Sequence, residues 1–173
     1  NSSWMKQILL LLAPLCLLLP GCAGYSLGSQ KPVQLRHITK LAVPTFENLT
    51  LEPRLAVLVT NSIIKQLQNH GSYQIVARRD AEAVLEGKIQ NIQRSQFRSD
   101  RNNILRTSQI QATLVCDFMV KEAGSGKILR TGASSAESNM IIDANMQLSE
   151  TQLLEDIAQK LAFPLADELS EGW

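Results

Sequence analysis

Cys22 is the residue whose type and setting point most directly to a chemical step. It follows Leu19-Pro20-Gly21 at the end of an apolar run over residues 8–19, and Lys6 supplies a positive charge ahead of that run. This layout is typical of a secretory signal, and a small residue directly before a cysteine is typical of a lipoprotein signal. The run is also shorter than the ~20 apolar residues that span a bilayer. We therefore predict cleavage after residue 21 and attachment of lipid to the Cys22 thiol.

Lipid on Cys22 would hold the mature chain at a membrane. Each buried methylene contributes ~0.8 kcal/mol, so several acyl chains give near-permanent attachment. The next residue is Ala23 rather than the Asp that marks retention in the inner membrane, which favours the periplasmic side of the outer membrane. Residues 1–21 are then a cleaved signal peptide, residues 22–39 a lipidated tether containing Gly, Ser, Gln and Pro, and residues 40–173 a single domain.

Four arginines form the second group with a chemical use, as a candidate phosphate-binding site. Arg94, Arg98, Arg101 and Arg106 cluster towards the tip of a predicted long hairpin, and only Asp100 opposes them there. Guanidinium groups match phosphate oxygens in geometry as well as in charge. An ordinary solvated loop with scattered charges accounts for the same residues, so the pattern alone leaves both interpretations open.

The other reactive side chains do not form a catalytic arrangement. Cys116 falls in phase with apolar neighbours, which predicts a buried thiol. His37 and His70 belong to the tether and to a helix end, and the carboxylates of Asp80 and Glu82 flank a turn. The sequence contains no glycine-rich phosphate loop, nucleophile elbow or metal-ligand spacing. We therefore expect a protein that is not an enzyme and that needs no cofactor or metal.

The charge balance argues against nucleic-acid binding. Loss of Lys6 with the signal leaves 17 − 1 = 16 basic residues against 16 acidic ones. General binding of nucleic acid relies on a cationic surface, which this neutral domain lacks. Cys16 also leaves with the signal and Cys22 carries lipid, so Cys116 has no partner for an intramolecular disulfide.

Hydrophobic patterning predicts elements in the order β-α-β-β-β-β-α. The alternation of apolar and polar residues is clearest over residues 110–120, and a shift of the apolar phase between Ile89 and Ile92 predicts a bulge near residues 90–91. Ser149 and Gln152 resemble a capping box at the start of the second helix. Strands are expected at 41–46, 73–76, 84–97, 107–121 and 127–138, helices at 53–70 and 149–169, and a loop at 139–148.

This order predicts an α+β fold, a two-layer sandwich. A strand–helix–strand start implies a right-handed crossover with a parallel strand pair, and the later hairpins are antiparallel. Each helix has one apolar stripe, so both helices should cover the same face of a four- to five-stranded mixed sheet. The opposite face carries Gln, Thr, Asp and Lys, and should be wet or bound to a polar partner.

Several stretches resemble a known family. LAVPTFEN at residues 41–48 continues into LEP at 51–53, YQIV follows at 73–76, and AEAVLEGKI occupies 81–89. Together with the lipoprotein signal, the two long strands after Gly87 and the closing helix, these are similar to the lipopolysaccharide-assembly lipoprotein LptE family. The resemblance covers nearly all of the mature chain.

The resemblance implies a non-enzymatic partner of the outer-membrane barrel LptD. Such a protein plugs the barrel, helps to assemble it and contacts lipopolysaccharide on its way to the outer leaflet. Arg98 occupies the place of a basic family residue implicated in lipopolysaccharide contact, which raises it above Arg94, Arg101 and Arg106. No counterpart of the family's second basic residue is evident on the following strand.

Three apolar residues lie on otherwise polar helix faces: Val57, Ile64 and Phe163. We interpret them as contacts to the barrel wall, although scattered surface hydrophobes are common. A second class also shares the strand–helix–strand start, namely envelope lipoproteins that resemble the CsgG or TolB N-terminal type and act in secretion or as structural binding modules. Those proteins assemble into rings or larger sensors, so the bound partners distinguish the two classes.

Overall fold

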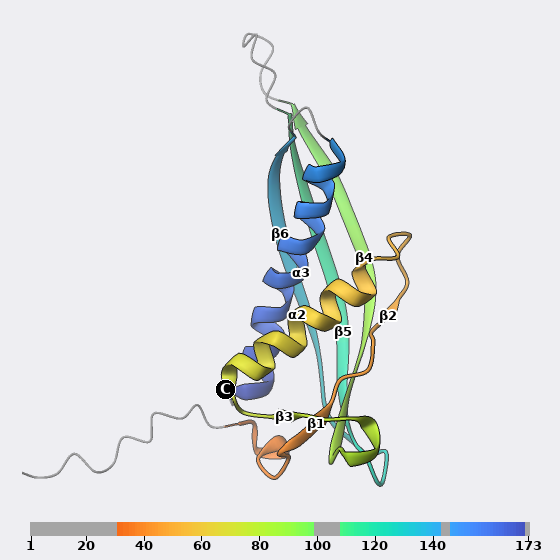
Figure 1. Cartoon of the computed structure of the whole chain (residues 1–173), viewed down its shortest axis with the longest axis vertical. Helices are drawn as coiled ribbons and strands as arrows, with labels where there is room; N and C mark the ends of the chain where they lie inside the picture. The colour runs from red at the N-terminus through yellow and green to blue at the C-terminus, as the bar shows by residue number, and fades with distance from the viewer. Residues whose placement is uncertain (1–30, 99–107, 143–145, 172–173) are drawn as a thin grey trace, which may run out of the picture.

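Two helices cover one face of an elongated mixed sheet (Figure 1). The computed structural model describes residues 31–98, 108–142 and 146–171. The predicted two-layer α+β sandwich is confirmed, with a sheet of six strands in these residues. The strands are β1 (Lys40–Ala42), β2 (Glu47–Asn48), β3 (Gln74–Ile75), β4 (Ala83–Arg98), β5 (Ser108–Glu122) and β6 (Ile128–Ile142), the helices are α2 (Leu55–His70) and α3 (Met146–Ser170), and two short 3-10 helices are η1 (Val33–Leu35) and η2 (Arg78–Asp80).

The strand order is β3-β1-β4-β5-β6, and β2 lies beside β4. β1 runs parallel to both β3 and β4, which confirms the predicted parallel pair. β4, β5 and β6 form successive antiparallel pairs, as expected for hairpins. The long three-stranded part of the sheet therefore comes from consecutive strands, and the short parallel strands extend it on the β4 side.

The predicted bulge in β4 is present. Ile89 lies opposite Cys116 on β5, whereas Ile92 lies opposite Leu114, with a register shift between Ile89 and Asn91. Gln90 is the additional residue. Because side chains alternate between faces, this extra residue keeps both isoleucines on the side of the sheet that the helices cover.

The first predicted strand, residues 41–46, is wrong as a single element. Only residues 41–42 of it belong to a strand, β1; residues 43–46 have no strand pairing, and β2 begins after the predicted range, at Glu47. Pro44 has no N–H to donate to a neighbouring strand. The Phe46 N–H donates instead to Thr60 Oγ1 of α2 at 3.0 Å. Both features interrupt the ladder at this point.

The predicted loop at 139–148 and the capping box at Ser149 are also wrong. β6 continues to Ile142, whose partner is Ser108 at the start of β5, and α3 already begins at Met146. Ser149 and Gln152 therefore lie inside the helix. The small and polar side chains of β6 do not alternate by hydrophobicity, so its length follows from pairing with β5 rather than from its own pattern.

The core lies between the helices and the sheet. The apolar stripe of α2 buries Leu55, Val59, Ile63 and Leu67 completely, and the broader arc of α3 does the same from Leu153 to Leu169. Burial of one such side chain contributes ~1.5–3 kcal/mol. α2 ends at His70, and the positive φ of 68° at the following Gly71 lets the Gly71 N–H donate to the carbonyls of Leu67 and Gln68. These contacts fix both helices on one face.

The core begins before residue 40. Leu35 and Ile38, which the sequence analysis places in the tether, are only 1% and 2% exposed and belong to the main hydrophobic cluster. The part of the chain that the structure describes before β1 is therefore packed against the domain.

Gly87 is required by a close approach between β4 and Phe46. A Cβ atom at this position would lie 1.9 Å from Cε2 of the Phe46 ring. The ring is 2% exposed, and its backbone N–H is bonded to Thr60, so it has little room to move. Phe46 thus connects the irregular segment after β1 to the centre of the sheet.

We expect Gly87→Ala to lower the free energy of unfolding by about 1–3 kcal/mol, because overpacking a filled core forces side chains off their rotamers. Gly124→Ala is the matched control, since a Cβ there has no heavy atom within 4 Å. Urea denaturation followed by circular dichroism measures both variants. Equal midpoints for the two would show that Phe46 does not pack against β4 as described.

Candidate functional site

The arginine-rich hairpin tip lies at one end of the long sheet. β4 ends at Arg98, which pairs with Ser108 on β5. Arg101, Arg106 and the side chain of Arg98 lie outside the described part of the chain. β4 has 16 residues and therefore extends ~50 Å at about 3.4 Å per residue. The described end of β4 is thus far from the short strands at the other end of the domain (Figure 1).

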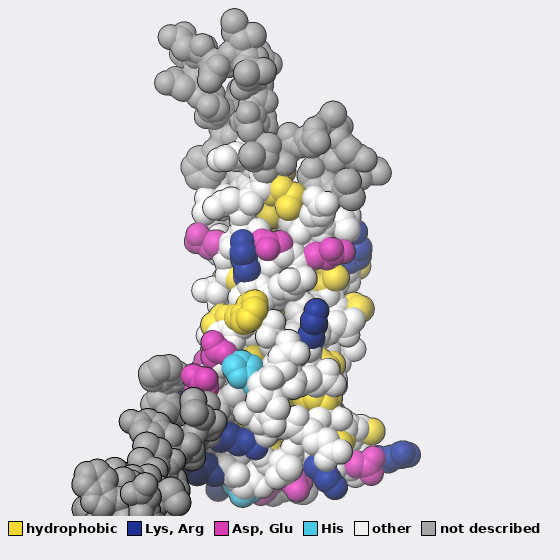
Figure 2. Space-filling model, turned by 60° about the vertical axis from the view of Figure 1, so that its left-hand side comes forward, with side chains coloured by type: hydrophobic (Ala, Val, Ile, Leu, Met, Phe, Trp, Pro, Cys, Tyr) yellow, Lys and Arg dark blue, Asp and Glu magenta, His cyan; other side chains and the backbone are white. Residues whose placement is uncertain are grey.

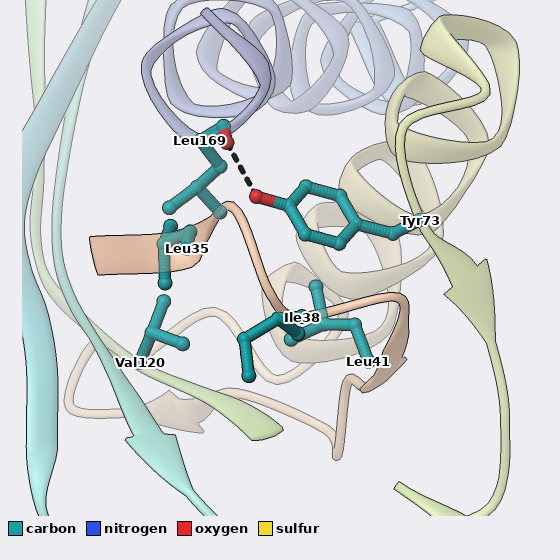
Figure 3. Close-up of a pocket in the computed structure, with 6 residues that line it drawn as sticks. All are labelled: Leu35, Ile38, Leu41, Tyr73, Val120 and Leu169. Atoms are coloured by element: carbon teal, nitrogen blue, oxygen red, sulfur yellow. Dashed lines mark hydrogen bonds between the residues drawn. The ribbon is translucent and has the colours of Figure 1, made fainter. Parts of the chain in front are cut away.

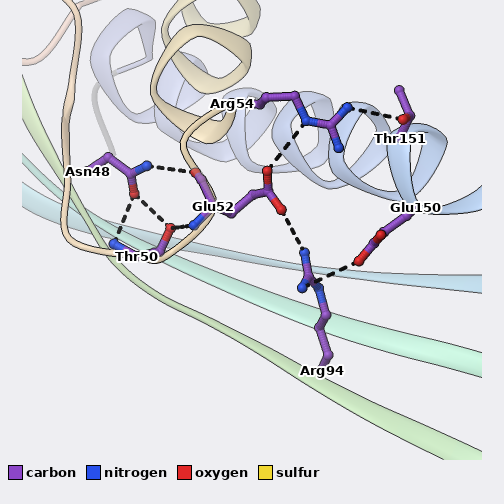
Figure 4. A network of polar contacts seen from close by, with 7 residues as sticks. All are labelled: Asn48, Thr50, Glu52, Arg54, Arg94, Glu150 and Thr151. Atoms are coloured by element: carbon purple, nitrogen blue, oxygen red, sulfur yellow. Dashed lines mark hydrogen bonds and ion pairs between the residues drawn. The ribbon is translucent and has the colours of Figure 1, made fainter. Parts of the chain in front are cut away.

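Arg94 does not belong to a free cationic cluster. It lies opposite Ala112, on the face that the helices cover, and its guanidinium meets Glu52 at 3.2 Å and Glu150 of α3 at 3.6 Å (Figure 4). Two carboxylates already compensate its charge. The sequence alone does not separate Arg94 from the arginines of the tip, because Glu52 and Glu150 are distant from it along the chain. The structure instead gives it a role in joining β4 to the β2–α2 loop and to α3.

A hydrogen-bond network orders the β2–α2 loop. The Asn48 side chain donates to the Glu52 carbonyl at 2.8 Å and accepts from the N–H and hydroxyl of Thr50 at 3.0 and 2.8 Å. Arg54 contacts the Glu52 carboxylate at 3.4 Å and donates to Thr151 at 3.1 Å (Figure 4). The loop is thus held to its own turn and to the start of α3.

The three apolar residues predicted as partner contacts lie on the outer surface of the helices. Val57 is 56% exposed and Phe163 is 52% exposed, whereas Ile64 is half-buried. Val57 and Ile64 share a face of α2, and Phe163 belongs to α3, which packs beside α2. On the face seen in Figure 2, hydrophobic side chains form separate spots among polar and charged ones. No broad hydrophobic patch is seen on this face.

The opposite face of the sheet is mostly polar, although Val115 and Met119 of β5 also lie on it, and no described helix covers it. Its side chains form cross-strand hydrogen bonds, from Gln90 to Asp117 at 2.7 Å and from Gln111 to Glu137 at 3.2 Å. Thr113 lies between them on the central strand β5. This arrangement agrees with the expectation of a wet face or a face for a polar partner.

The first described residues are fixed at the end of the domain opposite the hairpin tip. The Lys31 ammonium lies 4.2 Å from the centroid of the Tyr73 ring and donates to the Ile38 carbonyl at 2.6 Å. The Tyr73 hydroxyl donates to the Leu169 carbonyl at 2.5 Å, and burial raises the pKa of this phenol above its usual range. Figure 3 shows a small apolar hollow here, which belongs to the core; its lining residues are Leu35, Ile38, Leu41, Tyr73, Val120 and Leu169.

Glu82 reinforces this attachment. Its carboxylate accepts the backbone N–H groups of Thr39 at 2.6 Å and Lys40 at 3.0 Å. These two bonds lower the pKa of the Glu82 carboxyl. Glu82, in the turn before β4, therefore fixes the start of β1. The preceding chain joins the domain at this point.

The remaining reactive side chains have structural environments. Cys116 is fully buried, as predicted, and burial raises the pKa of its thiol to about 12. His70 Nε2 lies 2.8 Å from Asp167 and links the ends of the two helices. In the described ranges, no three His, Cys, Asp or Glu side chains gather where they could hold a metal. None of the described helices is both long and apolar enough to span a membrane.

Comparison with known proteins places this domain in a family. The family model for LptE, described as lipopolysaccharide-assembly, matches residues 38–169. The chain therefore belongs to the LptE family of lipopolysaccharide-assembly lipoproteins, as the sequence resemblance predicted. The match runs from Ile38 to Leu169, two residues that line the hollow where the chain joins the domain. A search of curated protein sequences found no match.

Solved structures share the fold at low sequence identity. A neuraminyllactose-binding hemagglutinin homolog from Helicobacter pylori has a TM-score of 0.55 at 12% identity, covering 83% of this chain and 87% of its own. A Caulobacter crescentus protein described as a lipoprotein has a TM-score of 0.51 at 14% identity, with coverages of 73% and 88%. At this identity the likeness concerns the fold alone.

We expect the Cys116 thiol to resist alkylation in the folded protein, because a thiol with a pKa of about 12 carries almost no thiolate near neutral pH. Mass spectrometry after incubation with a maleimide measures this in a Cys16→Ser/Cys22→Ser variant, with urea-unfolded protein as the fully reactive reference. Adding Asp117→Cys provides the control, because this neighbour lies on the open face. Equal rates for the two thiols would contradict the assignment of faces in β5.

Proposed function

We propose that this chain is an outer-membrane lipoprotein without enzymatic activity that seats in an LptD-type barrel, helps to assemble it and contacts lipopolysaccharide during its transport to the outer leaflet. The observation that carries the proposal is the LptE family match over residues 38–169, which spans the two-layer domain from its buried N-terminal segment to the last turn of α3. Cys22 is the proposed site of lipid attachment, on the periplasmic side of the membrane.

The surface chemistry supports a role as a plug. The lumen of a large barrel is polar and water-lined, so a protein that fills it needs a mostly polar exterior. The open sheet face is mostly polar, and hydrophobic side chains form only separate spots on the face seen in Figure 2. The ~50 Å length of β4 also exceeds the ~25 Å height of the apolar band of such barrels. A domain of this length reaches through the barrel with its hairpin tip.

The positions of the two ends support a direction for lipopolysaccharide contact. The chain joins the domain near Lys31 and Tyr73, whereas the hairpin lies at the far end of β4. An anchor at one end leaves the end of β4, where the arginine segment begins, far from the anchor. Arg94 forms ion pairs with Glu52 and Glu150. We therefore assign the proposed phosphate contacts to Arg98, together with Arg101 and Arg106.

We expect affinity isolation of the tagged chain from detergent-extracted outer membranes to recover an LptD-type barrel, identified by mass spectrometry. Replacing Val57, Ile64 and Phe163 together with Ser should lower that recovery, because exposed apolar side chains at an interface lose their contacts on truncation.

Asn61→Ser with Gln159→Ser is the matched control, since these exposed polar residues lie on the same two helices. Unchanged recovery for the triple variant would remove the three residues from the interface. A homo-oligomeric ring without any barrel would contradict the proposed function and favour the class that resembles the CsgG or TolB N-terminal type.

We expect Arg98→Asp to weaken lipopolysaccharide binding about tenfold or more while leaving the barrel complex intact, because it replaces a phosphate-binding fork with a repelling charge. Surface plasmon resonance with immobilised lipopolysaccharide measures the change. Arg98→Lys should give an intermediate affinity, since it keeps the charge but loses the fork.

Arg79→Asp is the control for net charge, because the Arg79 side chain is 86% exposed and belongs to η2, outside the long hairpin. Equal lipopolysaccharide binding by Arg98→Asp and the unmodified chain would contradict a phosphate-binding role for Arg98.

A further inference from the structure

The β2–α2 loop presents the most exposed hydrophobic side chain of the described residues. Leu51 is 103% exposed, Leu49 before it is 52% exposed, and Val57 in the first turns of α2 is 56% exposed. Single exposed leucines are common on protein surfaces. Leu51 differs because its side chain is fully exposed and does not pack in the core, although hydrogen bonds order the loop around it.

The order of this loop comes from the polar residues that surround the leucines. Asn48, Thr50 and Glu52 bond to one another through side chains and backbone, at 2.8–3.2 Å. Arg94 of β4 holds Glu52 from the sheet side (Figure 4). The backbone on both sides of Leu51 is thus fixed before any partner arrives. A preorganised contact binds at a lower entropic cost than a loop that must order on binding.

The charges around the loop indicate what kind of partner fits. Glu52 is paired with Arg54 at 3.4 Å and with Arg94 at 3.2 Å, and Glu47 is paired with Lys88 at 2.9 Å. Cations and carboxylates therefore compensate one another around the leucines. Binding to a lipid surface favours a broad apolar face flanked by unpaired Lys and Arg. Two exposed leucines surrounded by paired charges fit a small apolar recess on a protein instead.

The loop also lies apart from the two ends of the domain. It projects beside β4, between the level of the short strands and that of the described end of β4 (Figure 1). A protein that surrounds the domain would face the loop at this level. Under the proposed function, that protein is the barrel, whose interior is otherwise polar.

We propose that Leu51, flanked by Leu49, is an apolar anchor that inserts into a recess on the inner wall of the barrel partner. This inference rests on the proposed function and adds a contact site to it. Asn48 is a positioning residue, because it shapes the loop without itself presenting apolar surface. This contact is separate from the arginine tip and from Phe163 of α3.

The full lipidated chain with Leu51→p-benzoylphenylalanine tests the occupant directly. Irradiation of outer membranes should join residue 51 to the barrel in one dominant adduct, identified by mass spectrometry. Ile128→p-benzoylphenylalanine is the matched control, because Ile128 is 54% exposed at the start of β6. An adduct with lipid or with a second copy of the chain at residue 51, while tagged chain still recovers the barrel, would overturn the anchor and leave the proposed function standing. Failure to recover any barrel would overturn both.

Truncation measures the contribution of the anchor. Leu51→Ser should weaken the complex about tenfold or more in a detergent-based binding assay, with an unchanged urea midpoint. Ile128→Ser should change neither. Asn48→Ala should also weaken the complex, and adding Leu51→Ser to it should cause little further loss, since both act through one contact. Full additivity of the two, or full affinity of Leu51→Ser, would contradict the proposal.

Discussion

The one-residue bulge in β4 decides how the functional surface is arranged. An extra residue in a strand turns every later side chain to the opposite face of the sheet. Gln90 is that residue, and the register beyond it places Ile92 and Arg94 on the helix side. Only there can Arg94 meet Glu52 of the β2–α2 loop and Glu150 of α3. Without the bulge, the arginine would lie on the open polar face and the loop would lose its contact with the sheet.

Sequence patterns predicted the features that depend on neighbours along the chain. The bulge follows from a local shift of apolar phase, and the burial of Cys116 follows from strict alternation in β5. Features that depend on distant partners were missed. Arg94 looks like one of four similar arginines until Glu52 and Glu150 are brought to it, and the full length of β6 is visible only from its pairing with β5. The loss of strand pairing at Phe46 likewise involves a side chain of α2, Thr60.

The small side chains of β6 allow α3 to pack closely against this strand. On the helix side of β6, Ser134 donates to the Leu161 carbonyl at 3.2 Å and Ser138 bonds to Asp156. Gly132 on the same face leaves room for the Phe118 ring, which lies 2.4 Å from the place of a Cβ. Small side chains thus let α3 approach closely, and hydroxyls satisfy the polar groups that this approach buries. Neither the close approach nor the hydroxyl hydrogen bonds can be predicted from hydrophobic periodicity.

The interactions that stabilise this domain differ from those that shape its contact surfaces. Partly exposed ion pairs such as Arg94–Glu52 each contribute only about 0–1 kcal/mol, far less than the buried leucines of α2 and α3. Yet the ion pair fixes the position of the loop that carries Leu51, while the leucines of the core fix only the packing of the layers. Substitutions in the loop network should therefore change partner binding much more than stability. This separation lets the loop surface change without loss of the fold.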